Sequence, residues 1–211
     1  PPKLLLILLL GWLNTRAVIT SQGEKNRTRL LQAGPLIVEA DVNDSDIPHI
    51  INAWMYSSYA VTPDKHDIKK YFNRLLRKLM HWDLPGPTIK NRSQLAEKPT
   101  MLVIHERFTE VHAMYRCYAP SIRKLSQYFE LVTMAEEAHI DEAGKAIFDQ
   151  VILVAEKKNI TDLVKHIREL APDMIYYPSL GMSHWTVLLA QLRLAPIQIM
   201  THGHPATSMS D

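Results

Sequence analysis

The second half of the sequence alternates short apolar segments with helical segments, and this alternation restricts the fold more than any other feature. The apolar segments are typical of buried strands and lie at residues 101–104, 129–134, 151–154, 174–177 and 197–201. The helical segments lie between them at residues 112–127, 161–170 and 185–192. Strands that alternate with helices build a parallel sheet from βαβ units. We therefore predict an α/β domain with a parallel sheet over residues 98–211.

In the first half of the sequence, the apolar residues recur with the spacing of helices instead. Helices are expected in the aliphatic run 4–13, from Ser21 to Leu31, after Asp44-Ser45, and after an N-cap at Thr62 with Pro63 as the first helical residue. Residues 83–99 contain several prolines and no apolar period, and they predict a linker. We expect an all-α part with this linker over residues 1–97, so the fold class is mixed.

The helix after Thr62 has the clearest apolar stripe. The stripe consists of Ile68, Phe72, Leu75, Leu76 and Leu79. The basic residues lie mostly off the stripe and are Lys69, Lys70, Arg74, Arg77 and Lys78. Basic helix faces of this kind are commonly solvated, so we expect these side chains to face water.

Composition and charge exclude several classes of function. With 46% apolar residues, 22% charged residues and a net charge of +2, the chain is an ordinary globular protein with no feature typical of nucleic-acid binding. Its single cysteine, Cys117, excludes an internal disulfide and fits a reducing compartment such as the cytoplasm. The aliphatic run 4–13 is too short to span a bilayer and lacks the flanks of a signal peptide, so we expect a buried helix and no membrane span.

Three loops are expected to meet at one edge of the sheet, because parallel strands all end at the same edge. These loops are residues 105–112, 178–184 and 202–208. Their polar or conformationally special residues are His105, Glu106, Glu110, His112, Ser179, Gly181, Ser183, His184, His202, His204, Thr207 and Ser208. A crevice at this edge is the expected ligand site. The sequence contains neither of the usual glycine-rich phosphate-binding loops.

Several chemistries were weighed for these residues. A metal could use His202 and His204 with His105 or His112, but paired cysteines and ordered carboxylates are lacking, so we expect no metal site. Cys117 is expected to be a packed side chain, and no G-x-S-x-G nucleophile motif is present.

His112 has two interpretations. It precedes Tyr115 and Arg116 by three and four residues, so all three can share a helix face. A histidine there can accept a proton or donate a hydrogen bond, and Arg116 can bind a carboxylate or phosphate. The alternative is a histidine that caps the helix beside a surface arginine.

Several strings resemble one enzyme family. They are Arg193-x-Ala195-Pro196-Ile197-Gln198, Gly203-His204-Pro205-Ala206-Thr207, His112-Ala113-Met114-Tyr115-Arg116, Tyr176-x-Pro178-Ser179-x-Gly181-Met182, Phe148-Asp149 and Tyr59-Ala60-x-x-Pro63-x-Lys65-His66-x-Ile68-Lys69. The chain resembles the bacterial cytoplasmic N-glycosyltransferases of the adhesin-modifying type. These enzymes are cousins of the eukaryotic O-GlcNAc transferase, which has Tyr in place of His204.

The resemblance implies a GT-B enzyme with a helical domain and two Rossmann-like domains, of which this chain would hold the first. Such enzymes transfer glucose from UDP-glucose to Asn in Asn-x-Ser/Thr sequons of adhesins, with inversion and without a metal or cofactor. The resemblance implies that His112 is the catalytic residue. It also implies substrate-binding roles for Arg116, Ser179, Gly181, His204 and Thr207, with Tyr59 and His66 on the acceptor side.

The resemblance further implies that a second Rossmann-like domain follows Asp211 and makes most nucleotide contacts. We expect the chain to be a fragment that is inactive alone. Two other functions stay open at this stage. One is O-linked transfer to Ser or Thr, and the other is a binding module without catalysis.

Overall fold

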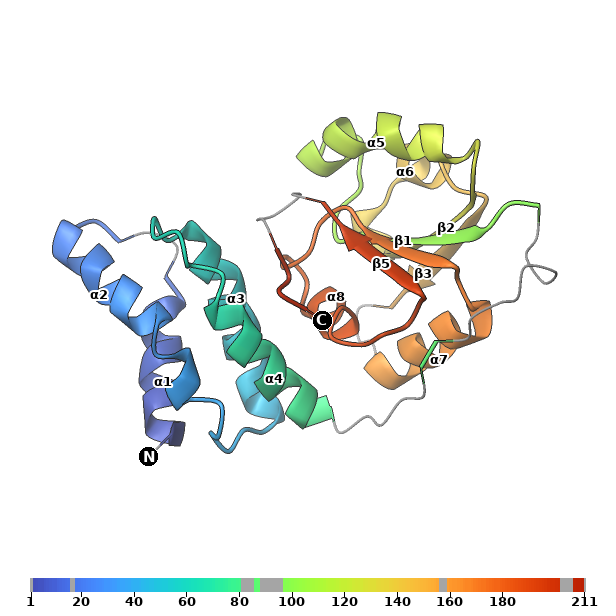
Figure 1. The fold of residues 1–211 in the computed structure, drawn as a ribbon. Coiled ribbons are helices and arrows are strands. Elements are labelled where there is room, and N and C mark those ends of the chain that lie inside the picture. The colour runs from blue at the N-terminus through green and yellow to red at the C-terminus, as the bar shows by residue number, and fades with distance from the viewer. Residues whose placement is uncertain are drawn as a thin grey trace. The chain divides into compact units, whose positions relative to one another are not determined.

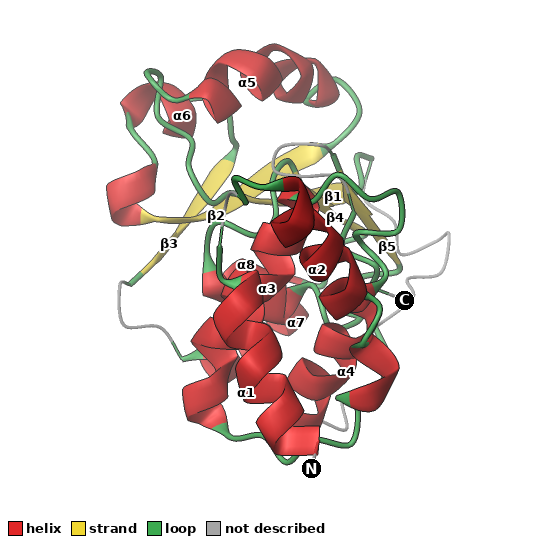
Figure 2. Cartoon of the chain, turned by 90° about the vertical axis from the view of Figure 1, so that its left-hand side faces the viewer, coloured by secondary structure: helices red, strands yellow, loops and turns green. Residues whose placement is uncertain are grey.

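The computed structural model describes residues 2–15, 18–80, 86–87, 97–155, 159–201 and 207–210, and the chain forms two compact units. The helical unit comprises Pro1–Leu84 together with Pro205–Asp211, and the α/β unit comprises Pro85–His204. Figure 2 shows the strands of the α/β unit in yellow and the helices in red. The last residues, Pro205–Asp211, group with the helical unit, and the predicted domain ranges 1–97 and 98–211 stay predictions.

The helical unit contains the four expected helices, which are α1 (Pro2–Leu13), α2 (Ser21–Leu31), α3 (Ile47–Tyr56) and α4 (Ile68–Met80). Helix α1 buries Leu6, Leu9, Leu10 and Leu13. The expectation of a buried helix is correct for this face only, since Leu8 and Trp12 on the other side are 53% and 66% exposed. In the part of the chain that the structure describes, no helix is long and apolar enough to cross a membrane.

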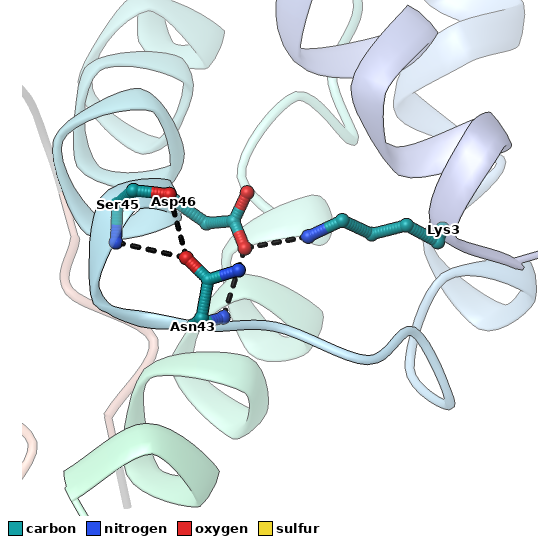
Figure 3. Close-up of polar contacts among 4 residues, drawn as sticks. All are labelled: Lys3, Asn43, Ser45 and Asp46. Carbon is teal, nitrogen blue, oxygen red and sulfur yellow. Dashed lines mark hydrogen bonds and ion pairs between the residues drawn. The ribbon is translucent and has the colours of Figure 1, made fainter.

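A capping box begins the short 3-10 helix Asp44–Asp46, which leads into α3, and a lysine of α1 binds to it (Figure 3). Asn43 Oδ1 accepts from the backbone N–H of Ser45 at 3.0 Å, and Asp46 Oδ2 accepts from the backbone N–H of Asn43 at 2.9 Å. The same Asp46 oxygen accepts from Lys3 Nζ at 2.6 Å. The cap satisfies N–H groups that a helix start leaves unpaired, and the lysine attaches α1 to it.

Helix α4 differs from the sequence prediction in two ways. It begins at Ile68, because residues 62–67 form turns, so Thr62 is not its N-cap and Pro63 is not its first residue. The apolar stripe is buried as predicted, but Lys69 is 0% exposed rather than solvated. The reason is that residues 207–209 lie against this side of the helix, as the hydrogen bonds below show.

The α/β unit contains a five-stranded parallel sheet, as predicted. Its strands are β1 (Thr100–Ile104), β2 (Glu130–Glu136), β3 (Gln150–Val154), β4 (Met174–Tyr177) and β5 (Ile197–Met200), in the order β3-β2-β1-β4-β5. Its helices are α5 (Ala113–Leu125), α6 (Glu142–Lys145), α7 (Ile160–Leu170) and α8 (His184–Leu189). Figure 1 shows α5 and α6 on one face of the sheet and α7 and α8 on the other.

The covering of both faces explains why the strands are apolar without alternation. On the α5 face, Met101 and Val103 of β1 pack with Ile122 of α5 in one core cluster. Leu102 and Ile104 alternate with them along β1 and are also fully buried. The strand order reverses between β1 and β4, and ligands bind open α/β sheets at such a switch point.

Candidate functional site

Two of the three expected loops meet at the switch point, and one glutamate joins them. Glu106 follows β1 and is 1% exposed. Its Oε1 accepts from the backbone N–H groups of Gly181, Met182 and Ser183 at 2.8, 2.9 and 2.9 Å. The same oxygen accepts from Thr186 Oγ1 at 2.6 Å. The loop after β1 is therefore fixed to the loop after β4 through one carboxylate.

Three successive N–H groups that point at one atom form a concave anion site. Gly181 has φ 122°, a backbone conformation that favours glycine, and its N–H donates to the carboxylate. In this chain the anion is the protein's own carboxylate, so the Gly181 N–H is already bound. Ser179 is 1% exposed in the same loop. The substrate-binding roles of Ser179 and Gly181 stay predictions, and the structure buries both residues in the loop after β4.

The structure confirms the capping interpretation of His112, and its catalytic role stays a prediction. His112 is the N-cap of α5, and its Nδ1 accepts from the backbone N–H of Met114 at 3.2 Å. Because Nδ1 accepts, the neutral ring carries its hydrogen on Nε2, which can donate to a ligand. Burial lowers the pKa of His112, and the positive charges of Arg107 and Arg116 lower it further. The half-buried side chain is thus held as a neutral donor.

Arg116 lies one turn after His112 on α5. Its Nη1 donates to the backbone carbonyl of Val111, which attaches the guanidinium to the loop before the helix. The side chain is exposed at the same end of α5, so it supplies positive charge beside His112. This placement fits the predicted substrate-binding role, which stays a prediction.

His105 is a core residue. Its ring stacks on Phe108 with 3.8 Å between the ring centroids and lies edge-on to Phe148 at 5.5 Å. Burial lowers the pKa of His105 to about 3. The metal hypothesis that used it has no support from the described ranges, in which no three His, Cys, Asp or Glu residues come together. His202 and His204 lie outside these ranges.

A cavity of about 370 Å³ lies at the same edge of the sheet, on the side of α7 and α8. It is lined by Glu136, Ile160, Met182, Ser183, His184, Trp185 and Leu188. Trp185 Nε1 donates to Glu136 Oε1 at 2.8 Å. Ser183 and His184 were among the edge residues predicted from the sequence, and Glu136 was not. The position of Glu136 at the end of β2 could have indicated it, since this end lies at the same edge of the sheet as the ends of β1 and β4.

Three predicted site residues belong to the helical unit, namely Tyr59, His66 and Thr207. Burial lowers the pKa of His66 to about 4, with contributions from Lys69 and Lys65. Tyr59 ends a short 3-10 helix, and its ring centroid lies 6.1 Å from that of Tyr56. His112, Arg116, Ser179 and Gly181 belong to the α/β unit, and His204 lies outside the described residues.

Sequence reasoning missed Lys69 as a functional candidate. Its Nζ donates to the backbone carbonyl of Thr207 at 2.9 Å and lies 3.9 Å from the ring centroid of Trp54. Burial, with a smaller contribution from the charge of Lys65, lowers the pKa of Lys69 to about 7. Within the described ranges no carboxylate pairs with Lys69, and a strongly perturbed pKa makes a buried lysine a candidate functional residue.

Comparison with known proteins gives three findings. Residues 1–80 match the family model described as HMW1 domain 2. Over 217 aligned residues, the chain is 30% identical to a UDP-glucose:protein N-beta-glucosyltransferase of Actinobacillus pleuropneumoniae serotype 5b. The corresponding protein of serotype 7 is also 30% identical. Both alignments cover 100% of this chain and 35% of the relative, so the chain spans about a third of the length of these curated relatives.

Among solved structures, the chain is similar to a mutant of the Thermobaculum terrenum O-GlcNAc transferase. The TM-score is 0.45 at 14% identity, over 86% of this chain and 37% of that chain. The resemblance that the motifs predicted is confirmed: over its whole length the chain is similar to the two UDP-glucose:protein N-beta-glucosyltransferases of Actinobacillus pleuropneumoniae, and over residues 1–80 it is similar to HMW1 domain 2.

Proposed function

We propose that this chain is part of an inverting glycosyltransferase that moves glucose from UDP-glucose to Asn in Asn-x-Ser/Thr sequons of acceptor proteins. The observation that carries the proposal is the 30% identity over the whole chain to relatives named UDP-glucose:protein N-beta-glucosyltransferase. The proposed acceptor is an adhesin, and the proposed compartment is the cytoplasm. The single cysteine supports a reducing compartment.

The proposed enzyme has the GT-B arrangement, in which a second Rossmann-like domain supplies most nucleotide contacts. The contacts of Glu106 support the proposal that most nucleotide contacts come from the second domain. At the switch point of the α/β unit, the three backbone N–H groups suited to an anion already bind its carboxylate. The nucleotide phosphates therefore need a cradle in another part of the protein.

His112 is the proposed catalytic residue. The lone pair of an amide nitrogen is delocalised, so removal of a proton by a histidine is not sufficient to make it attack a sugar. With Nδ1 occupied by the Met114 N–H, His112 can instead donate from Nε2 to an oxygen that gains negative charge as the nucleotide leaves. Arg107 and Arg116, whose charges act on His112, favour the same anionic state. These positive groups support a mechanism without a metal, which we also propose.

The test is peptide glucosylation by the complete protein that contains this chain. We expect an Asn-x-Thr peptide to gain one hexose from UDP-glucose in intact-mass spectra, with and without EDTA. Matched Gln-x-Thr and Asn-x-Ala peptides are the controls and should stay unmodified. Equal gain on the Gln-x-Thr peptide would favour O-linked transfer, and no gain on any peptide would favour a binding module. Loss of transfer with EDTA would contradict the metal-free mechanism alone.

A further inference from the structure

Two polar side chains lie on the buried side of α4, one helical turn apart. Lys69 and Asn73 are both 0% exposed. Lys69 Nζ donates to the carbonyl of Thr207 at 2.9 Å, and Asn73 Nδ2 donates to the carbonyls of Ser208 and Met209 at 3.0 and 2.9 Å. Two neighbouring side chains therefore bind three successive backbone carbonyls of a segment more than 130 residues away.

Trp54 of α3 orients both side chains. Its Nε1 donates to Asn73 Oδ1 at 2.9 Å, which turns the amide nitrogen of Asn73 toward the C-terminal segment. The ammonium of Lys69 lies 3.9 Å from the centre of the Trp54 ring, where a cation is attracted by the face of the indole. Trp54, Lys69 and Asn73 thus form one polar cluster inside the helical unit.

A buried lysine in this cluster is expected to stabilise the helical unit less than an apolar side chain would. The Lys69 ammonium has lost its water, and within the described ranges no carboxylate pairs with it. Charging a buried lysine without an ionic partner is costly, which is why the pKa of Lys69 falls to about 7, and an apolar side chain of similar length avoids this cost. Stability alone therefore does not explain a lysine at this position.

The contacts of Thr207 show what the cluster achieves. The Thr207 carbonyl is held by Lys69, and the Thr207 hydroxyl oxygen accepts from the backbone N–H of Met209 at 3.2 Å. Within the described part of the chain, the hydroxyl hydrogen has no recorded acceptor. A hydroxyl hydrogen in this position can donate to an oxygen of a ligand.

We propose that Lys69 and Asn73 are positioning residues that hold Thr207 so that its hydroxyl can donate to the substrate of the proposed glycosyltransferase. The substrate role of Thr207 rests on the proposed function. The binding of the segment 207–209 by the cluster does not, so the two parts are tested separately.

The first test measures the segment itself in the complete protein. Hydrogen exchange, followed by mass spectrometry of peptides that cover residues 207–210, reports how firmly the segment is held. We expect at least tenfold faster exchange in Lys69→Met and Asn73→Leu. Lys70→Met is the matched control, because Lys70 is exposed on the same helix and pairs with Asp67 at 2.8 Å. Unchanged exchange in both cluster variants would overturn the positioning role.

The second test measures the consequence for transfer. We expect Lys69→Met to lower kcat/KM for peptide glucosylation at least tenfold, while its Tm stays equal to or above that of the wild type. Thr207→Val should lower kcat/KM to a similar extent. The double variant should lose no more kcat/KM than the more strongly impaired single variant, because both changes remove the same contact to substrate.

Three outcomes separate the claims. If the Tm of Lys69→Met falls together with its activity, the cluster has a structural role only, and the positioning role is contradicted. Independent, multiplying losses in the double variant would contradict the link between Lys69 and Thr207. No transfer by the wild type, combined with the expected exchange results, would reject the proposed function and leave the binding of the segment intact.

Discussion

At the scale of single residues, His112 carries two roles that substitution can separate. Its Nδ1 caps α5, and its Nε2 is the proposed donor. We expect His112→Ala to lower the free energy of unfolding by about 1 kcal/mol, the usual effect of a lost cap. We also expect it to lower kcat at least 100-fold, the lower range for a positioned proton donor.

His112→Asn is the matched control for this prediction, because the asparagine side chain is itself a favourable cap. It should restore stability, as measured by urea unfolding, without restoring transfer. Recovery of transfer in His112→Asn would show that capping is the whole function of this residue. That outcome would support the capping interpretation, which spacing in the sequence could not exclude.

His105 predicts a pH dependence of stability. Its pKa is lowered by burial to about 3, from 6.5 in an exposed histidine. As the pH falls below 6.5, the unfolded chain takes up a proton at this position and the folded chain does not. The free energy of unfolding should therefore decrease by up to about 1.4 kcal/mol per pH unit between pH 6.5 and 3.

The measurement is urea unfolding of the wild type and His105→Phe between pH 7 and 5. The variant keeps an aromatic ring against Phe108 and removes the titrating group. We expect its pH slope to be smaller, by a difference that grows toward one proton as the pH falls to 5, whatever its absolute stability is. Equal slopes in the two proteins would show that His105 is not buried as a neutral ring.

At the scale of elements, Glu106 connects the loops after β1 and β4. Glu106→Ala leaves the N–H groups of Gly181, Met182 and Ser183 without their shared acceptor. We expect a loss of about 3 kcal/mol in the free energy of unfolding, as for other broken buried charge contacts. Glu106→Gln keeps an acceptor oxygen in place and should lose clearly less in the same chemical denaturation. Equal losses in both variants would contradict the role of the oxygen.

The sequence predicted elements well where their signals are local. The five strands follow from apolar runs of the right length, and the parallel sheet follows from the helices between them. The predicted start of α4 was wrong, because Thr62 and Pro63 are residues that favour a helix start but lie in turns that precede the apolar stripe. The signals for a cap do not by themselves determine where burial begins.

The burial of Lys69 and the hydrogen bonds of Glu106 could not be predicted from local sequence patterns. Lys69 is covered by a segment 138 residues later in the chain, and helical periodicity contains no information about such a partner. Glu106 lay among the expected edge residues, but its four donors come from a loop and helix about 75–80 residues later. Spacing indicated the right edge of the sheet and not the contacts within it.

At the scale of the whole molecule, the chain does not divide at one point. The helical unit contains both the first 84 residues and the last seven, with the α/β unit between them in sequence. The predicted site residues are shared between the units, with Tyr59, His66 and Thr207 in one and His112, Arg116, Ser179 and Gly181 in the other. A protein cut at residue 97 would separate Lys69 and Asn73 from the carbonyls that they bind.

The central claim is transfer of glucose to the nitrogen of asparagine, and localisation of the sugar tests it most directly. The complete protein is incubated with UDP-glucose and a peptide that contains one Asn-x-Thr sequon, and fragment-ion mass spectrometry then locates the hexose. The account predicts that the hexose is on Asn and that His112→Asn abolishes the signal. A hexose on Thr, or undiminished transfer by His112→Asn, would contradict it.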